Sequence, residues 1–413
     1  MKNTVGLGLP EYSFNTTNKA LIVGAGLAGC AIANALAQRG YQCALFDKNT
    51  SVAEGASALP AAVVRPATGG NAFYSSWFNS AFELCCNTFS DTLFQRCGAL
   101  ELTGNENSTG FLTAAQASDH AGTQLNSSAV YIKNAGVVVP RDICNHWITH
   151  PLIEFHPATA VSSLKKTEYG WQLLADNNTV IEESQLIILA TAASQLNVVS
   201  EVPLQPVAGQ IDRFEYTGPA LQCIVNGQGY LVPDTPDAPQ SVWCGATHHR
   251  TVSGAAVSAA DSAANKATAA AIAPQLVTAA SPASSFAAAR TFTPDRLPVV
   301  GAIHDAHRYR ADYVDLKHGK SPDSFQAPAF HHGLYLAAGL GSRGATQALL
   351  VGELLAGLIA GRMNDNSQSH IKRSEQSKPE GGIGGVASAD QLRSFCRELH
   401  PARFLIRALR RGR

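Results

Sequence analysis

Six residues near the N-terminus form a GxGxxG turn that suits the binding of a dinucleotide: Gly24, Ala25, Gly26, Leu27, Ala28 and Gly29. Gly24 permits a tight turn, Gly26 lets the backbone approach a pyrophosphate, and Gly29 allows a following helix to pack closely on a strand. Asp47 follows at the spacing at which an acidic side chain accepts hydrogen bonds from a ribose diol. Its negative charge disfavours a ribose 2′-phosphate, so the pattern indicates a dinucleotide other than NADP.

The elements that must position these residues are visible in the flanking sequence. Residues 20–23 are an apolar run typical of a buried parallel strand, and residues 42–46 form a second strand that stops at Asp47. An Ala-rich helix joins the two strands and ends near Gly40. The N-terminus of that helix would present unpaired N–H groups and the positive end of its dipole to the phosphates.

A second joint of strand, glycine turn and helix lies near the other end of the chain. Residues 333–338 are an apolar strand, and an apolar helix covers residues 345–361. The turn between them consists of Gly339, Leu340, Gly341, Ser342, Arg343 and Gly344. Such a joint aims a helix N-terminus at an anionic or electron-rich group. Two joints of this kind are typical of a two-domain flavoprotein, whereas an NAD dehydrogenase would not need the second.

The remaining sequence predicts a mixed α/β fold. Residues 161–190 contain short strands that close on an apolar strand at 186–191, and residues 203–250 alternate like the strands of an antiparallel sheet. Helical spacing is present over 73–93 and 255–280. Residues 103–130 and 305–330 are expected to form irregular loops.

We expect two domains that each use separate parts of the chain. A Rossmann-like cofactor domain would comprise residues 19–66, 135–200 and 285–362, and a substrate domain with an antiparallel sheet would comprise 67–134 and 201–284. Residues 1–18 would be a lead-in, residues 363–398 a polar, Gly-rich linker, and residues 399–413 a basic C-terminal element.

Composition and charge describe an ordinary globular protein. Of the 413 residues, 45% are hydrophobic and 15% charged, and the formal net charge is zero, so no global field attracts the chain to nucleic acid or to membranes. The nine cysteines are scattered without a CxxC pair or a metal-like spacing, which indicates reduced thiols and no metal site. Without a signal-peptide pattern or a span of sufficient length, we expect a cytoplasmic protein that does not enter the membrane.

These features resemble the D-amino-acid-oxidase-like superfamily, which includes glycine, sarcosine and D-amino-acid oxidases. A closer resemblance is to the FAD-dependent C-terminal half of the bifunctional tRNA 5-methylaminomethyl-2-thiouridine biosynthesis proteins. It rests on segments in family order: 54–66 (EGASALPAAVVRP), 207–210 (VAGQ), 229–233 (GYLVP), 244–250 (CGATHHR), 290–301 (RTFTPDRLPVVG), 338–344 (AGLGSRG) and 399–412 (LHPARFLIRALRRG). The family's methyltransferase half is expected to be absent, because only a short lead-in precedes residue 20.

The resemblance implies non-covalently bound FAD and oxidation of 5-carboxymethylaminomethyl(-2-thio)uridine at the tRNA wobble position. The carboxymethyl group would leave as glyoxylate, O2 would reoxidise the flavin, and a separate methyltransferase would act downstream. FAD would supply the difficult chemistry while the protein orients the substrate. The family pattern places the backbone of Val161 against adenine, and we also assign Lys48 and Ser57 to the cofactor site.

The implied substrate carboxylate calls for a bidentate arginine. Arg290 begins a family motif at the expected domain junction and is the first candidate to pair with the carboxylate. Arg343, in the second glycine turn, could bind the substrate or the flavin. Arg65 is the third candidate. The alternative for Arg290 is a structural ion pair within the sheet.

Four further side chains have a functional and a structural interpretation. Gln210 and Tyr230 could line the substrate pocket, or they could pack in the core or on a strand. His248 and His249 are interpreted as surface or packing histidines rather than general bases, because hydride transfer from an amine needs little more than the neutral amine.

The basic ending of the chain is the local feature that favours tRNA. It contains Arg403, Arg407, Arg410, Arg411 and Arg413. Arginines that neutralise phosphates give sequence-independent, salt-dependent affinity for nucleic acid. A solvated basic tail is the alternative.

Two departures from the family pattern leave other functions open. Residues 58–62 (ALPAA) replace a Gly-Asn-rich stretch near the expected flavin, and Ala192 stands where flavoproteins commonly have Gly. A flavin-bound scaffold without catalytic activity is therefore one alternative. A free glycine, sarcosine or D-amino-acid oxidase is another, since it would share every flavin motif without needing the basic ending.

Overall fold

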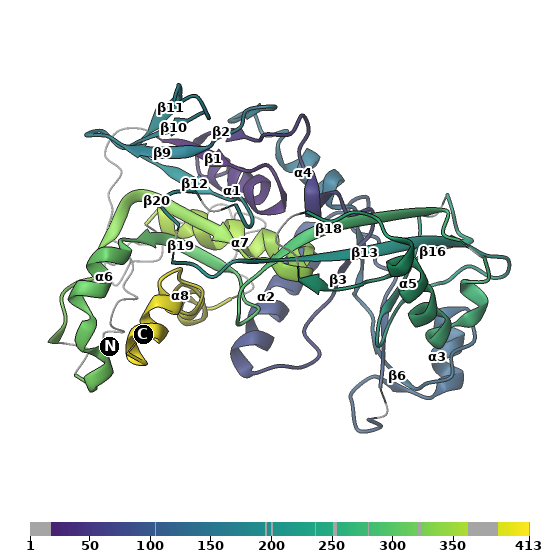
Figure 1. Ribbon diagram of the computed structural model, residues 1–413. Coiled ribbons are helices and arrows are strands. Elements are labelled where there is room, and N and C mark those ends of the chain that lie inside the picture. The colour runs from purple at the N-terminus through teal and green to yellow at the C-terminus, as the bar shows by residue number, and fades with distance from the viewer. Residues whose placement is uncertain are drawn as a thin grey trace, which may run out of the picture. The chain divides into compact units, whose positions relative to one another are not determined.

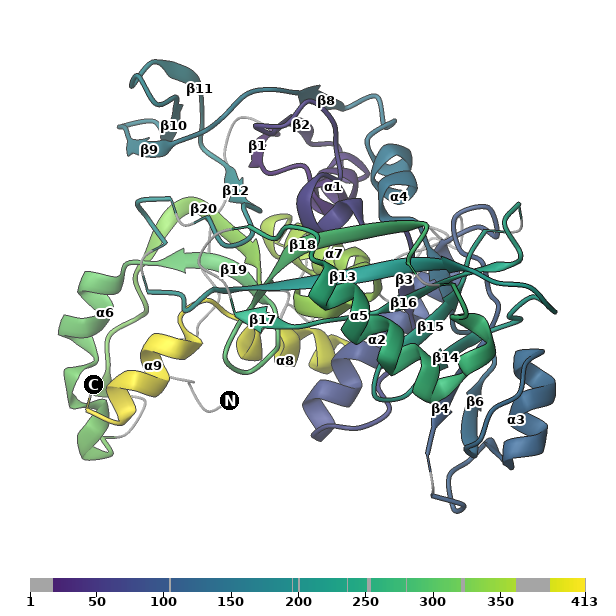
Figure 2. The ribbon, with the colours of Figure 1, turned by 45° about the vertical axis from the view of Figure 1, so that its right-hand side comes forward.

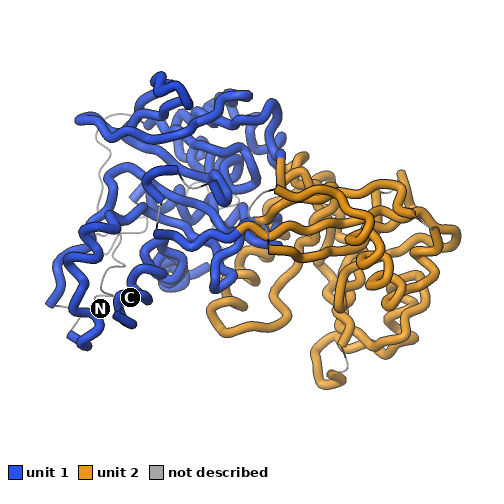
Figure 3. Tube along the Cα trace, in the orientation of Figure 1, with its two compact units in different colours: residues 1–54, 144–205, 291–413 blue, residues 55–143, 206–290 orange. Residues whose placement is uncertain are grey.

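The computed structural model describes residues 18–103, 105–194, 196–199, 201–235, 237–250, 254–279, 281–320, 324–361 and 387–412 (Figure 1). Nearly all of the predicted lead-in and residues 363–386 of the predicted linker lie outside these ranges. The chain forms two compact units (Figure 3): residues 1–54, 144–205 and 291–413 make the first, and residues 55–143 and 206–290 the second. Residues 55–66, 135–143 and 285–290, which we expected in the cofactor domain, belong to the second unit.

The first unit is built on a six-stranded sheet with the order β19-β20-β12-β1-β2-β8. Its strands are β1 (Lys19–Val23), β2 (Gln42–Phe46), β8 (Ile153–His156), β12 (Ile187–Leu189), β19 (Val299–His304) and β20 (Phe330–Ala338). All neighbours are parallel except β19 and β20. Near-continuous apolar sequence makes β1, β12 and β20 buried strands, as predicted.

Two helices of the first unit begin at the predicted glycine turns and pack against each other. They are α1 (Leu27–Ala37) and α7 (Gly344–Ile359). A Cβ atom at Gly352 of α7 would lie 2.6 Å from the carbonyl oxygen of Ala31 in α1, so the two backbones approach as closely as glycine allows. A small antiparallel sheet of β9 (Ser163–Lys166), β10 (Trp171–Leu174) and β11 (Val180–Ser184) confirms the predicted short strands.

The loop predicted over residues 305–330 is wrong for its first half, which is helical. It contains α6 (Ala306–Asp312) and the 3-10 helix η3 (Val314–His318), and the Asp305 side chain caps α6 by accepting the Arg308 N–H. Two C-terminal helices, α8 (Ala389–Glu398) and α9 (Arg403–Arg410), complete the unit. Figure 2 shows α9 beside α6. Buried residues of the two segments form one apolar cluster that includes Tyr309, Tyr313, Leu405 and Ile406.

The second unit contains the predicted antiparallel sheet. Its nine strands are β4 (Ala99–Leu102), β5 (Phe111–Leu112), β6 (Ala129–Ile132), β13 (Gln205–Glu215), β14 (Ile224–Asn226), β15 (Tyr230–Pro233), β16 (Ser241–Gly245), β17 (His249–Arg250) and β18 (Ser284–Phe292). In this sheet β14 and β4 form a parallel pair, whereas β13 with β16 and β17, β15 with β14 and β16, and β6 with β4 and β5 form antiparallel pairs. A separate two-stranded antiparallel sheet pairs β3 (Ala62–Val64) with β7 (Gly136–Val138).

One of the remaining helices, over residues 114–121, was not predicted from the sequence. Those of the second unit are α2 (Ala72–Thr88), α3 (Ala114–Ala121) and α5 (Ala259–Ile272), while α4 (Pro140–Trp147) runs across the unit boundary. Residues 103–130 were expected to be irregular, but Thr113 and Gln116 form a capping box that starts α3. No helix in the described ranges is long and apolar enough to cross a bilayer.

Candidate functional site

The first glycine turn joins the carboxyl ends of β1, β2 and β12. The Gly24 N–H donates to the Phe46 carbonyl at 2.8 Å, and Gly24 has a φ of 105°, which a residue with a side chain rarely adopts. A Cβ atom at Gly24 would lie 2.5 Å from the Ala190 oxygen, and one at Gly29 would lie 1.8 Å from the Gly24 oxygen. Strands β2 and β12 lie on opposite sides of β1, so this is the point where the strand order reverses. Ligands of open α/β sheets bind at such a point.

The donors and the acceptor around this turn fit a dinucleotide. Gly26 begins α1 without a side-chain cap, so the first N–H groups of the helix are not taken by a capping side chain. The Asp47 carboxylate, at the end of β2, accepts the Ala25 N–H at 2.7 Å and the backbone N–H of Asn49 at 2.9 Å. It is therefore held beside the turn, where a ribose diol would need an acceptor.

The second glycine turn lies next to the first. Gly339 and Gly341 have φ values of 75° and 58°, and Cβ atoms there would lie 2.8 Å from Thr293 and 2.9 Å from Phe292. A Cβ atom at Gly344 would be in ordinary contact, at 3.7 Å, with Leu27 at the start of α1. The helices after both turns therefore start side by side.

The other residues assigned to the cofactor occupy varied positions. Lys48 is exposed after β2, and Val161 is half-buried just before β9. Ser57 is half-buried in the 3-10 helix η1 (Gly55–Ala58), which belongs to the second unit. In the second turn, Leu340 accepts a hydrogen bond from Gln347 at 2.5 Å, Ser342 is exposed, and Arg343 is half-buried at the start of α7.

The two departures from the family pattern have different structural consequences. None of residues 58–62 has a positive φ, so their side chains create no backbone strain, and Ala61 and Ala62 are buried. Ala192, in contrast, has a φ of 54°, a left-handed conformation that favours glycine.

Arg290, on β18, is a half-buried cation for which the described residues supply no carboxylate within ion-pair distance. Its Nη2 donates to the Thr247 carbonyl at 3.2 Å. Burial lowers the pKa of the guanidinium, and Tyr230 opposes this shift. The alternative interpretation of Arg290, a structural ion pair within the sheet, is therefore not present among the residues that the structure describes.

Tyr230 adds a second donor near Arg290. Burial raises the pKa of the phenol to about 12, and the positive charge of Arg290 opposes that rise, so the two groups lie close enough to interact. Tyr230 thus stays protonated at neutral pH. A guanidinium with a phenolic O–H beside it can hold a carboxylate by charge-assisted hydrogen bonds.

Two other candidates for substrate binding have protein partners. Arg65 lies 2.8 Å from the Glu101 carboxylate, so its charge is already balanced. Gln210 is 1% exposed, and its side-chain amide donates to Asp212 and Ser262 and accepts from the Ser258 N–H. Gln210 is therefore a member of a buried polar network, which agrees with the packing interpretation of this residue.

The two histidines considered as bases are both exposed. The Nε2 atom of His249 lies 2.6 Å from the Asp261 carboxylate, and Nδ1 of His248 lies 3.2 Å from the Ala246 carbonyl. Sequence reasoning missed Gly209 and Thr247, which contact Arg290; both lie in the motifs 207–210 and 244–250.

The basic C-terminal element is partly structural. Arg403 is 2% exposed and makes a bidentate ion pair with Asp295, at 2.9 and 3.0 Å, while Arg407 reaches the same carboxylate at 2.7 Å. Burial disfavours the ionised Asp295, but hydrogen bonds from Arg403 and Arg407 outweigh it and lower the pKa to about 2. Arg410 and Arg411 are exposed. Arg403, which the sequence analysis counted in the basic ending, is therefore buried and paired within the protein.

A family model described as "FAD dependent oxidoreductase" matches residues 19–358. The chain belongs to this family, so it is an oxidoreductase and FAD is its cofactor, as predicted.

Among curated relatives, the chain is similar to two proteins named "tRNA 5-methylaminomethyl-2-thiouridine biosynthesis bifunctional protein MnmC". It is 28% identical to the one from Pseudomonas savastanoi pv. phaseolicola and 29% identical to the one from Ralstonia nicotianae, in each case over 95% of its length. The chain spans only 60% and 61% of these relatives. These matches confirm the resemblance seen in the sequence.

Solved structures confirm the predicted fold class. Glycine oxidase from Geobacillus kaustophilus matches with a TM-score of 0.66 and 22% identity, over 83% of this chain and 95% of that one. Iminodiacetate oxidase from Chelativorans sp. BNC1 matches with a TM-score of 0.64 and 20% identity, also over 83% and 95%.

Proposed function

We propose that this protein oxidises the carboxymethylaminomethyl group of wobble uridine in tRNA, acting on its CH–NH bond and releasing glyoxylate. The similarity to proteins named for tRNA 5-methylaminomethyl-2-thiouridine biosynthesis supports the tRNA substrate. The observation that carries the chemistry is Arg290, a half-buried cation without a carboxylate partner among the described residues. A carboxylate on the substrate would complete this pair.

The reaction removes two electrons from the carbon between the amine and the carboxylate. Bound FAD would supply the two-electron oxidation by accepting a hydride from that carbon. Arg290 would hold the carboxylate bidentately, and Tyr230 would donate a further hydrogen bond, so that the C–H bond has one orientation. Water then adds to the resulting imine and the C–N bond breaks, leaving glyoxylate and the 5-aminomethyl nucleoside. We propose O2 as the final acceptor, and a separate methyltransferase as the enzyme that consumes the product in the cytoplasm.

Anaerobic reduction of the flavin tests this proposal. The purified holoenzyme is mixed with tRNA carrying the carboxymethylaminomethyl uridine, with glycine or with sarcosine, and the flavin absorbance is followed. Reduction by the tRNA together with release of glyoxylate is expected. Arg290→Lys should raise KM steeply, since a lysine cannot make the bidentate contact, while Arg65→Lys, whose arginine is paired with Glu101, should change KM little.

A free amino-acid oxidase is the second candidate, and one observation favours it. Arg403 and Arg407 are engaged with Asp295, which leaves fewer cations for tRNA than the sequence suggested. Reduction by glycine or sarcosine but not by tRNA would establish this candidate. If none of the three substrates reduces the flavin, the protein is a flavin-bound scaffold and the proposed activity is wrong.

A further inference from the structure

The strand β13, which carries Gln210, has a break in its pairing where the opposite side forms a bulge. Pairing of β13 with β16 ends at Ile211 and Gly245, and pairing with β17 resumes at Ala208 and His249. Two residues of β13 therefore face three residues, 246–248, on the other side. Such a bulge bends the strand and re-aims its groups, and bulges are frequent beside active sites.

The bulge turns the carbonyl of Thr247 toward Arg290. The Gln210 N–H donates to the Thr247 hydroxyl oxygen at 3.1 Å, and the Thr247 N–H donates to the Gln210 carbonyl at 3.2 Å. The Thr247 carbonyl is thereby left to accept Nη2 of Arg290 at 3.2 Å.

Gly209 provides the space in which the guanidinium lies. A Cβ atom there would be 2.0 Å from Nη2 of Arg290 and 2.6 Å from the Thr247 oxygen. Any side chain at position 209 would displace the guanidinium, because the Thr247 carbonyl on the same side belongs to the backbone and cannot move freely.

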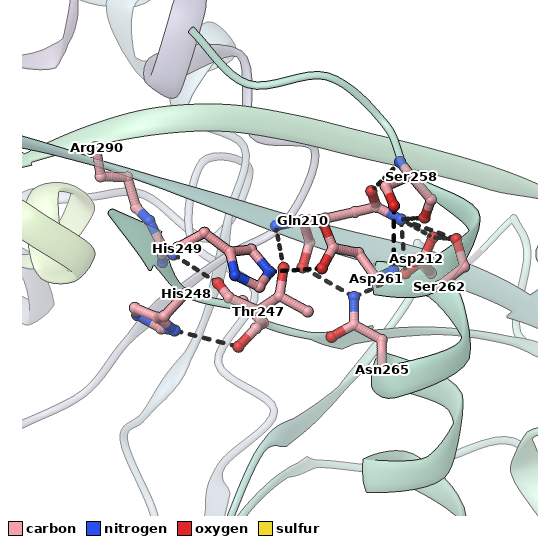
Figure 4. A network of polar contacts seen from close by, with 11 residues as sticks. Gln210, Asp212, Thr247, His248, His249, Ser258, Asp261, Ser262, Asn265 and Arg290 are labelled. Carbon is pink, nitrogen blue, oxygen red and sulfur yellow. Dashed lines mark hydrogen bonds and ion pairs between the residues drawn. The ribbon is translucent and has the colours of Figure 1, made fainter. Parts of the chain in front are cut away.

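A buried polar network fixes Gln210 from α5 (Figure 4). Asn265 donates to the Gln210 carbonyl at 2.9 Å and to the Asp212 carboxylate at 2.7 Å. Asp212 is fully buried, and its remaining hydrogen bonds come from neutral donors: Gln210, Ser262 and Ser285. Such a fully satisfied network rigidifies the strand that it holds.

We propose that Gly209, Thr247 and Asn265 are positioning residues for Arg290, and that the bulge and the Asp212 network together set the orientation of its guanidinium for a substrate carboxylate. This inference rests on the proposed function, in which Arg290 binds that carboxylate. A planar guanidinium makes two parallel hydrogen bonds only in one orientation, so a small displacement weakens binding more than it slows chemistry.

Chemical protection of Arg290 tests the inference without turnover. The holoenzyme is treated with phenylglyoxal, the modification expected at Arg290 is followed by mass spectrometry, and acetate is added as the carboxylate probe. In Thr247→Val and Asn265→Ala the acetate concentration that gives half-protection should rise about ten-fold. Lys266→Met is the matched control, because Lys266 also lies on α5 but donates to the Ala279 carbonyl, outside the network. The inference is overturned if the acetate concentration for half-protection is the same in both variants as in the control. It is also overturned if acetate does not protect Arg290 in the unaltered enzyme.

A double-mutant comparison separates positioning from simple loss of stability. In an Arg290→Lys background, Thr247→Val should raise the KM for the tRNA substrate no further, since the guanidinium that the Thr247 carbonyl positions is already absent. Additive losses would show that Thr247 acts independently of Arg290. Failure of tRNA to reduce the flavin would count against the proposed function, whereas the acetate result stands on its own.

Discussion

At the scale of single residues, the surroundings of Arg290 differ from those of three other arginines that are at least partly buried. Arg65, Arg213 and Arg403 each lie beside a carboxylate. A buried charge without such a partner is costly, so a protein keeps one where a ligand supplies the counter-charge. Arg290 is a cation of this kind among the described residues.

Ala192 carries the first prediction. Its φ of 54° strains a residue with a Cβ atom, so Ala192→Gly should raise the free energy of unfolding by about 0.5 kcal/mol, the relief of strain exceeding the entropy cost of glycine. Urea denaturation measures this change. Ala260→Gly, at an exposed position of α5, should instead lower stability by about 1 kcal/mol. A loss of similar size at both positions would contradict the prediction.

At the scale of elements, the contact between α1 and α7 holds the two glycine turns together. Gly352→Ala would place a Cβ atom 2.6 Å from the Ala31 carbonyl oxygen, which belongs to backbone. We expect a loss of about 1–3 kcal/mol in stability and weaker FAD binding, measured by flavin fluorescence on dilution. Gly254→Ala, at a glycine with open space around it, is the control. If the FAD affinity of Gly352→Ala is unchanged, the contact between α1 and α7 does not contribute to FAD binding.

The sequence predicted those elements whose signal is local. Both glycine turns and the strands before them were found because glycine spacing and apolar runs are properties of neighbouring residues. The helix α6 was missed because its tyrosines are buried by α9, roughly a hundred residues later in the chain. The pairing of Arg403 with Asp295 and the packing of Arg290 over Gly209 could not be predicted either. Such contacts form between residues that are distant in the sequence, so local spacing does not indicate them.

At the scale of the whole molecule, buried histidines make stability depend on pH. Burial lowers the pKa of His304 to about 4 and that of His400 to about 3, from an ordinary 6.5. The unfolded chain therefore binds more protons below pH 6.5, and folding stability falls as the pH drops from 6.5 toward 4. The loss is about 1.4 kcal/mol per pH unit for each imidazole.

Urea midpoints at pH 7.5 and pH 5.0 measure this loss. His304→Phe should reduce the difference between the two pH values, and it removes no hydrogen bond, because both ring nitrogens of His304 lack a partner in the described structure. An unchanged difference in this variant would exclude His304 as a source of the acid sensitivity.

The exposed part of the basic ending gives a prediction about tRNA. Arg410 and Arg411 are exposed, and Gly412 lies against Lys317 of η3, which adds a cation to the same surface. Charge reversal of Arg410 and Arg411 should weaken tRNA binding and reduce its salt slope by about two, without loss of FAD. Lys165→Glu with Lys166→Glu, two exposed residues on β9, is the control. Equal weakening by both pairs would indicate that tRNA does not bind at α9.

The neighbouring positions of Leu27 and Gly344 also have a consequence for synthesis of the protein. These two residues are 344 − 27 = 317 positions apart, yet each begins one of the two helices that start side by side. At about 5–20 residues per second, a ribosome needs roughly 15 to 60 s to travel from one to the other. For that interval the nascent chain carries its first phosphate-binding turn without the helix that packs against it. FAD should therefore be captured only after α7 has been synthesised.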